Sequence, residues 1–270
     1  MKNVLLYFGS FNPIHRGHIA LAEYAVEQGL CDEVILIVSP QNPHKAVADL
    51  APELLRFEMA EMACAASRFP EKIKPSVIEF MLERPSYTVN TLRHLKENFG
   101  SEMRFKILMG CDLINTLDRW KEYTEILDNY PILVYPRRGC EVEKFHDRIT
   151  YLHEAPLCDY SSTEVREAVE RGGNTSAMLH PTVAEYIREK LLYSTSWRIH
   201  SLNAALEQEP ENARLYLERG SCQYRSGSWG DAINDFNRCL ALDPENREAQ
   251  QLKDMVYEIL QYRYTDIYNP

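Results

Sequence analysis

The fold of this chain is decided by the stretch Gly9-Ser10-Phe11-Asn12-Pro13-Ile14-His15-Arg16-Gly17-His18. An apolar run over residues 4–8 precedes it and a helical pattern over residues 19–26 follows, which predicts a strand, a glycine turn and a helix. The two histidines, three residues apart at the helix start, can share one face. Free backbone N–H groups and the positive end of the helix dipole favour an anion there. The stretch therefore predicts phosphate chemistry on a nucleotide.

Length and composition limit the classes of protein to consider. The chain has 270 residues, of which 45% are hydrophobic, enough for one large domain or two modest ones. A formal net charge of −10 gives no basic field that would attract nucleic acid. The apolar run at the start is too short for a signal peptide or a membrane span, and no later stretch reaches membrane length.

The cysteines bear on the cellular compartment. The seven of them form no Cys-x-x-Cys pair and no spacing typical of a zinc site. Reduced thiols in a cytosolic protein are the simplest interpretation. We therefore expect a cytoplasmic protein with no membrane and no nucleic acid among its partners.

Strand and helix patterns alternate over residues 1–193, as in an α/β protein. After the first unit, strands are expected near residues 33–38, 76–80, 105–109, 131–135 and, more weakly, 149–152. Helices are expected at 52–67 and 89–98, the second capped by Thr88. This order predicts a Rossmann-like, doubly wound and mostly parallel sheet. Because ligands bind beyond the carboxyl ends of such strands, the first stretch and the loops at 40–45, 110–112 and 136–139 should share one rim.

Residues 194–270 have a different character, because strand signals vanish and the pattern becomes wholly helical. Four positions recur 34 residues later: Ile199, Asn203, Leu206 and Pro210 return as Ile233, Asn237, Leu240 and Pro244. The tetratricopeptide repeat has this period, and the small, aromatic and proline positions of that family resemble Gly220, Ala232, Phe236 and Pro244. We expect an all-helical, TPR-like domain. It is shorter than the usual array of about three repeats, so it should lean on the first domain or on a second copy.

A second motif, Ser161-Ser162-Thr163-Glu164-Val165-Arg166, begins another helix. Ser161 and Glu164 match a capping box. Ser162 and Thr163 then offer hydroxyl and N–H groups to an anion, and Arg166 lies about one turn further on. Alone, the motif fits an ordinary helix cap equally well. Together with the first stretch, it predicts a second phosphate contact.

These two motifs resemble the nucleotidyltransferases with an H-x-G-H signature, and within them the bacterial nicotinate-nucleotide adenylyltransferases. The resemblance covers residues 1–193, although Ser10 and Asn12 stand where that family usually has a glycine and an aspartate. Four further pieces are similar to that family: Asn42-Pro43-His44-Lys45, Arg84-Pro85-Ser86-Tyr87-Thr88-Val89-Asn90-Thr91-Leu92, Gly110-Cys111-Asp112 with Trp120 downstream, and Pro136-Arg137-Arg138-Gly139.

The resemblance implies a reaction in NAD biosynthesis. The phosphate of nicotinate mononucleotide attacks the α-phosphorus of ATP in line, giving deamido-NAD (nicotinate adenine dinucleotide) and pyrophosphate without a covalent enzyme intermediate. An anionic nucleophile needs no strong general base, so positioning and charge stabilisation carry the catalysis. The resemblance also implies Mg²⁺ bound mainly through the ATP phosphates, with few protein ligands of its own and no metal-binding residues to name.

The resemblance assigns roles on the ATP side. His18 is expected at the α-phosphate in the transition state, His15 at the bridging or leaving oxygens, and Arg166 at the β- and γ-phosphates. His15, His18 and Arg166 are thus the expected catalytic residues. The expected ATP-binding residues are Gly9, Ser10, Phe11, His15, His18, Arg137, Ser161, Ser162, Thr163 and Arg166.

For the mononucleotide, the resemblance assigns ring stacking to Trp120 and the nicotinate carboxylate to the backbone of Tyr87 and Thr88. Asp112 is expected at a ribose hydroxyl and Lys45 near the phosphates. Each has an ordinary alternative: core packing for Trp120, a helix cap for Asp112 and solvent exposure for Lys45. The residue after the tryptophan is often a hydrogen-bonding aromatic in that family, and here it is Lys121, which fits either a carboxylate contact or a solvated side chain.

Other functions share some of these sequence features. Class I aminoacyl-tRNA synthetases share the histidine motif, but their K-M-S-K-S loop is absent and the acidic balance disfavours tRNA. Adenylylation of nicotinamide mononucleotide is the nearest enzymatic alternative. A TPR scaffold with a degenerate front domain is the other, and the intact His15, His18, Ser162 and Arg166 argue against it. The helical tail is expected to serve self-association, to dock a peptide or protein, or only to stabilise the chain.

Overall fold

The computed structural model describes residues 1–40 and 50–267, with side chains up to residue 260. Its described part divides into two compact units, one ending at Lys190 and the other beginning at Leu191. This division lies close to the boundary expected after residue 193. No helix among the described residues is long and apolar enough to cross a membrane.

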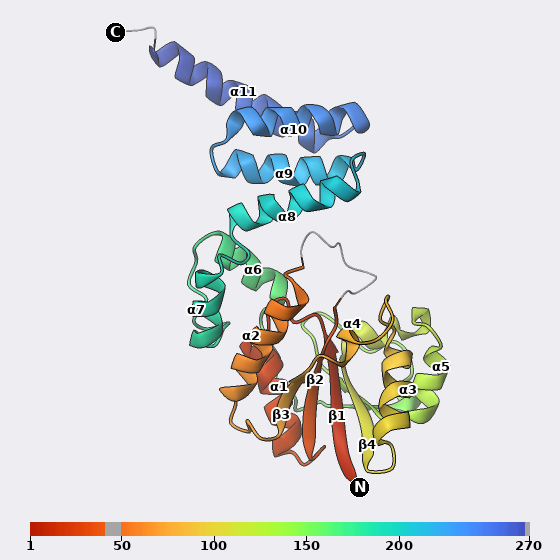
Figure 1. The fold of residues 1–270 in the computed structure, drawn as a ribbon. Helices are drawn as coiled ribbons and strands as arrows, with labels where there is room; N and C mark the ends of the chain where they lie inside the picture. Colours follow the sequence, from red (N-terminus) through yellow and green to blue (C-terminus); the bar gives the residue numbers. More distant parts are fainter. Residues whose placement is uncertain (41–49, 268–270) are drawn as a thin grey trace. The chain divides into compact units, whose positions relative to one another are not determined.

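The first unit is built on a six-stranded sheet in which every pairing is parallel (Figure 1). Its strands are β1 Lys2–Gly9, β2 Glu33–Val38, β3 Ile73–Ser76, β4 Met103–Gly110, β5 Ile132–Tyr135 and β6 Ile149–Tyr151. Their order is β3-β2-β1-β4-β5-β6, so the winding direction reverses between β1 and β4. This confirms the Rossmann-like α/β prediction. The reversal point is where such sheets leave a crevice for a ligand.

Helices cover both faces of the sheet (Figure 1). On one face lie α1 Arg16–Glu27 and α2 Glu53–Ala65, and on the other α3 Thr88–Phe99 and α5 Tyr123–Asn129. Among the described residues, the remaining helices of this unit are α4 Cys111–Ile114, α6 Ser162–Glu170 and α7 Pro181–Glu189, with short 3₁₀-helices at Ile78–Phe80, Leu117–Arg119 and His146–Arg148.

The central strand β1 is buried on both faces, as its continuous apolar run predicts. Val4 and Leu6 join a core cluster with Val89 and Leu92 of α3. Leu5, between them, points to the opposite face because side chains alternate along a strand, and it is fully buried too. The sheet is thus a rigid platform from which the loops at its carboxyl edge project.

Two local predictions were wrong. The strand expected at residues 76–80 is β3, Ile73–Ser76, followed by the 3₁₀-helix Ile78–Phe80. Pro75 weakens the strand pattern of this segment, because proline is rare in strands. However, β3 lies at the edge of the sheet, where a missing N–H is tolerated. Thr88 is the first residue of α3 rather than its cap, because Tyr87 occupies the N-cap position without a side-chain hydrogen bond.

In its described residues, the second unit is built from the helices α8 Thr195–Gln208, α9 Ala213–Arg225, α10 Trp229–Leu242 and α11 Arg247–Ile267 (Figure 1). Consecutive helices pack on one another. A Cβ added at Gly220 would lie 2.7 Å from the ring of Phe236, so the glycine permits the close approach of α9 to α10. Arg219 forms a bidentate ion pair with the buried Asp235 and also reaches Asn203, which links α8, α9 and α10.

The 34-residue sequence period has a local counterpart in this unit. Asn212 accepts a 3.1 Å hydrogen bond from the Arg214 N–H at the start of α9, and Asn246 accepts a 3.0 Å bond from the Ala249 N–H at the start of α11. Each asparagine is the last residue of the repeated Pro-Glu-Asn sequence and caps the helix that follows. The predicted helical tail is therefore present, with equivalent caps one period apart.

Candidate active site

A cavity of about 860 Å³ opens at the carboxyl ends of the central strands. Almost every residue that the sequence predicted for the site lines this cavity: Gly9, Ser10, Phe11, His15, His18, Tyr87, Thr88, Asp112, Trp120, Arg137, Ser161, Ser162, Thr163 and Arg166. Lys45 lies outside the described residues. The loops after β1, β4 and β5 therefore converge on one rim, as the parallel topology predicts.

The turn after β1 has an unusual backbone conformation, which close packing around Gly9 and Phe11 holds in place. Phe11 is buried and adopts a left-handed φ of +43°, and its ring meets that of His18 edge to face at 5.1 Å. A Cβ on Gly9 would lie 2.9 Å from the Phe11 ring, so this position requires glycine. Asn12 accepts a 3.0 Å hydrogen bond from the Ala51 N–H. An aspartate oxygen can accept the same bond, which explains why asparagine serves at this position.

The two histidines of the motif lie one on the other, with ring centroids 3.6 Å apart. The His15 N–H donates a 3.1 Å hydrogen bond to Nδ1 of His18, so the proton of the neutral His18 ring sits on Nε2. A Cβ on Gly17 would lie 2.3 Å from Sγ of Cys158, which explains the glycine of the H-x-G-H pattern.

His15 is uncharged at neutral pH. Burial lowers the pKa of its imidazole to about 3, with a further contribution from the positive charge of Arg137. Its Nδ1 is buried without a hydrogen-bond partner among the described residues, and Tyr160 meets the ring edge on at 5.3 Å. A neutral ring in this position can give or accept a hydrogen bond without adding charge to the cavity.

The second motif folds as the sequence predicted and contacts the first. Ser161 and Glu164 form the capping box of α6. Ser162 Oγ donates a 3.0 Å hydrogen bond to the Pro13 carbonyl, and the Arg166 guanidinium reaches the Asn12 carbonyl at 2.9 Å. The two motifs therefore form one structural piece, which the sequence alone does not reveal.

The residues that the sequence predicts to bind a pyridine ring line another part of the same cavity. Tyr87 and Thr88 stand at the beginning of α3, where unpaired N–H groups favour an anion. Trp120 is half-buried and also packs against the core cluster, so its packing and its place in the cavity coexist. Lys121 lines the same cavity, with its ammonium 4.7 Å from the centre of the Tyr87 ring.

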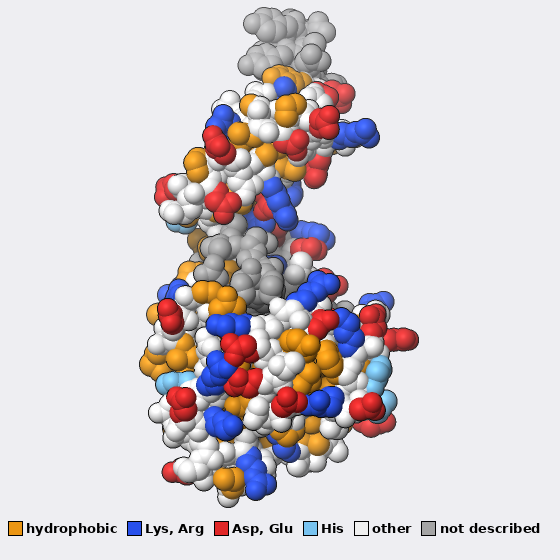
Figure 2. All heavy atoms as spheres, turned by 90° about the vertical axis from the view of Figure 1, so that its right-hand side faces the viewer, with side chains coloured by type: hydrophobic (Ala, Val, Ile, Leu, Met, Phe, Trp, Pro, Cys, Tyr) orange, Lys and Arg blue, Asp and Glu red, His pale blue; other side chains and the backbone are white. Residues whose placement is uncertain are grey.

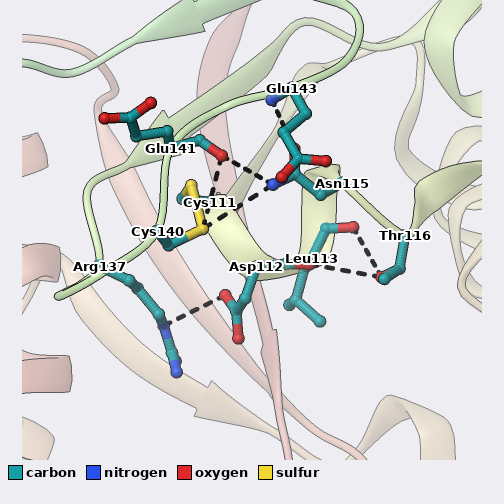
Figure 3. The surroundings of a disulfide bond; sticks show 9 residues. All are labelled: Cys111, Asp112, Leu113, Asn115, Thr116, Arg137, Cys140, Glu141 and Glu143. Atoms are coloured by element: carbon teal, nitrogen blue, oxygen red, sulfur yellow. Dashed lines mark hydrogen bonds and ion pairs between the residues drawn. A yellow bond between two sulfur atoms is a disulfide. The ribbon is translucent and has the colours of Figure 1, made fainter.

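Asp112 of α4 and Arg137 of the loop after β5 form an ion pair at 3.3 Å (Figure 3). Next to them, Cys111 and Cys140 form a disulfide, so the expectation of seven reduced thiols was wrong for this pair. The two cysteines lie 29 residues apart, and only the adjacency of β4 and β5 brings them together. Asp112 is not the helix cap either, because Gly110 holds that position in α4.

Asn115 strengthens the same junction (Figure 3). Its side-chain amide donates to the Glu141 carbonyl at 2.8 Å and accepts from the Glu143 N–H at 2.9 Å. The disulfide and this amide together hold the loop after β5 against α4. The position of Arg137 at the cavity rim follows from this attachment.

Arg56 is a supporting residue that the sequence did not identify. It is fully buried, and its guanidinium donates to the carbonyl oxygens of Ser10, Ser39, Pro40 and Ala51 at 2.6–2.8 Å. These bonds fix the loops that follow β1 and β2. An arginine in the amphipathic pattern of α2 is ordinarily expected to face water, so no sequence signal distinguished it.

One face of the first unit carries mixed charge. Figure 2 shows Lys and Arg side chains interspersed with Asp and Glu on the face that carries α3 and α5. Between these two helices, Arg93 of α3 forms ion pairs with Glu122, at the N-cap of α5, and with Glu125 of α5. The described cationic side chains on this face therefore form no continuous basic patch.

Comparison with known proteins agrees with the geometry. A family profile described as cytidylyltransferase-like matches residues 6–168. A probable nicotinate-nucleotide adenylyltransferase of Flavobacterium johnsoniae is 41% identical over 192 residues, covering 70% of this chain and 97% of that protein. A probable nicotinate-nucleotide adenylyltransferase of Bacteroides fragilis is 40% identical over 183 residues, covering 67% of this chain and 89% of that protein.

Solved structures share the fold. The Plasmodium falciparum nicotinic acid mononucleotide adenylyltransferase complexed with NaAD superposes with a TM-score of 0.61 at 19% identity, covering 72% of this chain and 98% of that one. A putative nicotinate-nucleotide adenylyltransferase from Vibrio parahaemolyticus gives a TM-score of 0.53 at 19% identity, covering 72% and 96%. These structures show the shared fold, and the family profile and the sequence relatives show the family. The chain belongs to the nicotinate-nucleotide adenylyltransferases of the cytidylyltransferase-like family.

Proposed function

We propose that the first unit transfers the adenylyl group of ATP to nicotinate mononucleotide, giving nicotinate adenine dinucleotide and pyrophosphate in NAD biosynthesis. The observation that carries this proposal is the shared cavity, which joins the two histidines, the α6 motif and the Tyr87–Trp120 region in one volume. Such a site can hold a triphosphate at one end and an aromatic ring at the other. Relatives named as probable nicotinate-nucleotide adenylyltransferases, whose own length this chain covers to 89–97%, support it.

At the reacting phosphorus, His18 donates its Nε2–H to an α-phosphate oxygen as negative charge grows in the transition state. The hydrogen bond from the His15 N–H to Nδ1 supports this role because it fixes the tautomer in advance. His15, uncharged, meets the bridging or leaving oxygens. A preorganised donor of this kind needs no rearrangement during the reaction.

Arg166, Ser162, Ser161 and Thr163 bind the β- and γ-phosphates of ATP at the start of α6, and Arg137 binds on the ATP side. The turn from Gly9 to Phe11 surrounds the α-phosphate with main-chain groups. The contacts of Ser162 and Arg166 with that turn support a common phosphate site. The nucleoside ribose of the mononucleotide meets Asp112, its ring stacks on Trp120, and Lys45 contributes near the phosphates.

Mg²⁺ is the proposed metal and binds through the phosphate oxygens of ATP. No group of three or more His, Cys, Asp or Glu side chains among the described residues could hold a metal by itself. A magnesium ion that keeps its waters and phosphate ligands requires no such group. When bound, it supplies positive charge to the leaving pyrophosphate. The protein side chains supply position and hydrogen bonds.

An assay with two nucleotides tests the proposal. Purified full-length protein is incubated with ATP and Mg²⁺, and with nicotinate mononucleotide or nicotinamide mononucleotide, while pyrophosphate release is measured. We expect faster release with the acid. A preference for the amide would reassign the substrate, and no release with either would favour the alternative of a scaffold with a degenerate enzyme domain.

We propose that the second unit is TPR-like and serves self-association or the docking of a peptide. The 34-residue period, the Gly220–Phe236 contact and the equivalent caps Asn212 and Asn246 support this assignment. We place the enzyme in the cytoplasm, where ATP is available. Deleting residues 194–270 and measuring mass and turnover tests the assembly role. If the number of subunits per particle and the turnover are both unchanged, the assembly role is wrong.

A further inference from the structure

The cavity end beside Trp120 contains a positive charge that the reaction does not explain. Lys121 lines this end together with Tyr87 and Thr88. Its side chain is exposed at the cavity mouth, and its ammonium lies 4.7 Å from the centre of the Tyr87 ring in a cation–π contact. This contact favours a position of the charge next to the first residues of α3.

Neighbouring carboxylates do not neutralise Lys121. Glu122 and Glu125 both bind Arg93, and Asp118 binds Lys144 at 2.6 Å. Within the described part of the chain, no carboxylate lies at ion-pair distance from the Lys121 ammonium. An ammonium that lines a cavity without an acidic partner is available for an anionic group of the ligand.

We propose that Lys121 sets the preference of this enzyme for the pyridine carboxylate over the carboxamide. The inference rests on the proposed function and adds to it the residue that distinguishes the charged carboxylate from the neutral amide. N–H groups at the start of a helix can bind either ligand, because both present a carbonyl-type oxygen. The ammonium has only donors, so it attracts the carboxylate and opposes the NH₂ of the amide.

The contact is remote from the reacting phosphorus, which predicts where the effect appears. Lys121 contributes equally in the ground state and the transition state, so its loss should raise KM for the acid and leave kcat nearly unchanged. A charge-assisted hydrogen bond is worth about tenfold to a hundredfold in affinity. The same change should leave the weaker reaction with the amide within about threefold, because no favourable contact is lost there.

The experiment compares kcat and KM for both mononucleotides in four full-length variants. Lys121→Met removes the charge and keeps the length, whereas Lys121→Arg keeps the charge. Arg119→Gln removes a second cation from the same cavity, and Lys72→Met removes one just before β3, at the edge of the sheet opposite the cavity. Thermal unfolding of each variant verifies that it is folded.

We expect Lys121→Met to lower the acid-to-amide ratio of kcat/KM by about tenfold to a hundredfold, with Lys121→Arg retaining most of the preference. Lys72→Met should match the wild type, and Arg119→Gln should shift the ratio much less than Lys121→Met. An unchanged ratio in folded Lys121→Met, or an equal shift in Arg119→Gln, would overturn the assignment. Failure of the wild type to use the acid would instead count against the proposed function.

Discussion

The guanidinium of Arg166 donates a 2.9 Å hydrogen bond to the carbonyl oxygen of Asn12, a residue 154 positions earlier in the sequence. The Ser162 hydroxyl makes a parallel contact with the Pro13 carbonyl at 3.0 Å. The start of α6 thereby holds the histidine turn in place. The two motifs act on the same backbone, so substitutions in one should alter the other.

Ser162→Ala tests this connection. The variant loses the Pro13 contact, and we expect a stability loss of about 1 kcal/mol in urea unfolding. Combined with Arg166→Ala, its effect on kcat/KM should be non-additive, because both side chains hold the same turn. Kinetics of the two single variants and the double variant measure the coupling. Strict additivity would mean that the turn does not depend on these contacts jointly.

His18→Ala should lower kcat by about a hundredfold to a thousandfold, since it removes a preorganised donor from the reacting phosphate. The KM for ATP should change less than kcat. Steady-state pyrophosphate release measures both quantities, with Lys72→Met as a remote control. Near-normal turnover in folded His18→Ala would contradict the role given to Nε2.

The burial of His15 predicts a pH-dependent stability. Its pKa is about 3 in the folded chain and near 6.5 when exposed, so only the unfolded chain binds a proton between these values. The stabilisation is complete above pH 6.5 and is lost as the pH falls toward 3. Between pH 6.5 and 4.5 the wild type should lose about 2 kcal/mol more than His15→Asn. Urea unfolding at the two pH values measures this difference, and equal losses would mean that His15 titrates normally.

The Cys111–Cys140 disulfide predicts a thiol count and a loop effect. Denatured, unreduced protein should show five reactive thiols, and reduced protein seven. Cys140→Ser should lower the free energy of unfolding by roughly 3 kcal/mol, because the bond closes a long loop in the unfolded chain. It should also raise KM for ATP, since the loop that carries Arg137 loses an attachment. Seven reactive thiols before reduction would contradict the bond.

Arg56→Met should destabilise the first unit by about 3–5 kcal/mol. The substitution leaves several buried carbonyl oxygens without a donor, and each unsatisfied group costs about 1–3 kcal/mol. Turnover should fall as well, because the Ser10 carbonyl belongs to the histidine turn. Urea unfolding and steady-state kinetics measure the two effects. A variant as stable as the wild type would show that water replaces the guanidinium.

The sequence by itself determined the α/β order, the histidine turn and the capping box of α6. These features rest on interactions between residues a few positions apart, such as the Ser161–Glu164 cap or the continuous burial of β1. Their residue types and spacing are therefore enough to predict them. The grouping of the nominated site residues followed from the rule that parallel strands end at one edge.

Only the tertiary structure decided the burial of Arg56, the pairing of Cys111 with Cys140 and the contact of Lys121 with Tyr87. Each depends on segments that are distant in sequence and adjacent in space. The edge strand β3 was missed for a related reason, because its pairing with β2 outweighs the weak strand signal of a proline-containing segment. Local patterns specify which elements form, whereas long-range packing specifies which side chains meet.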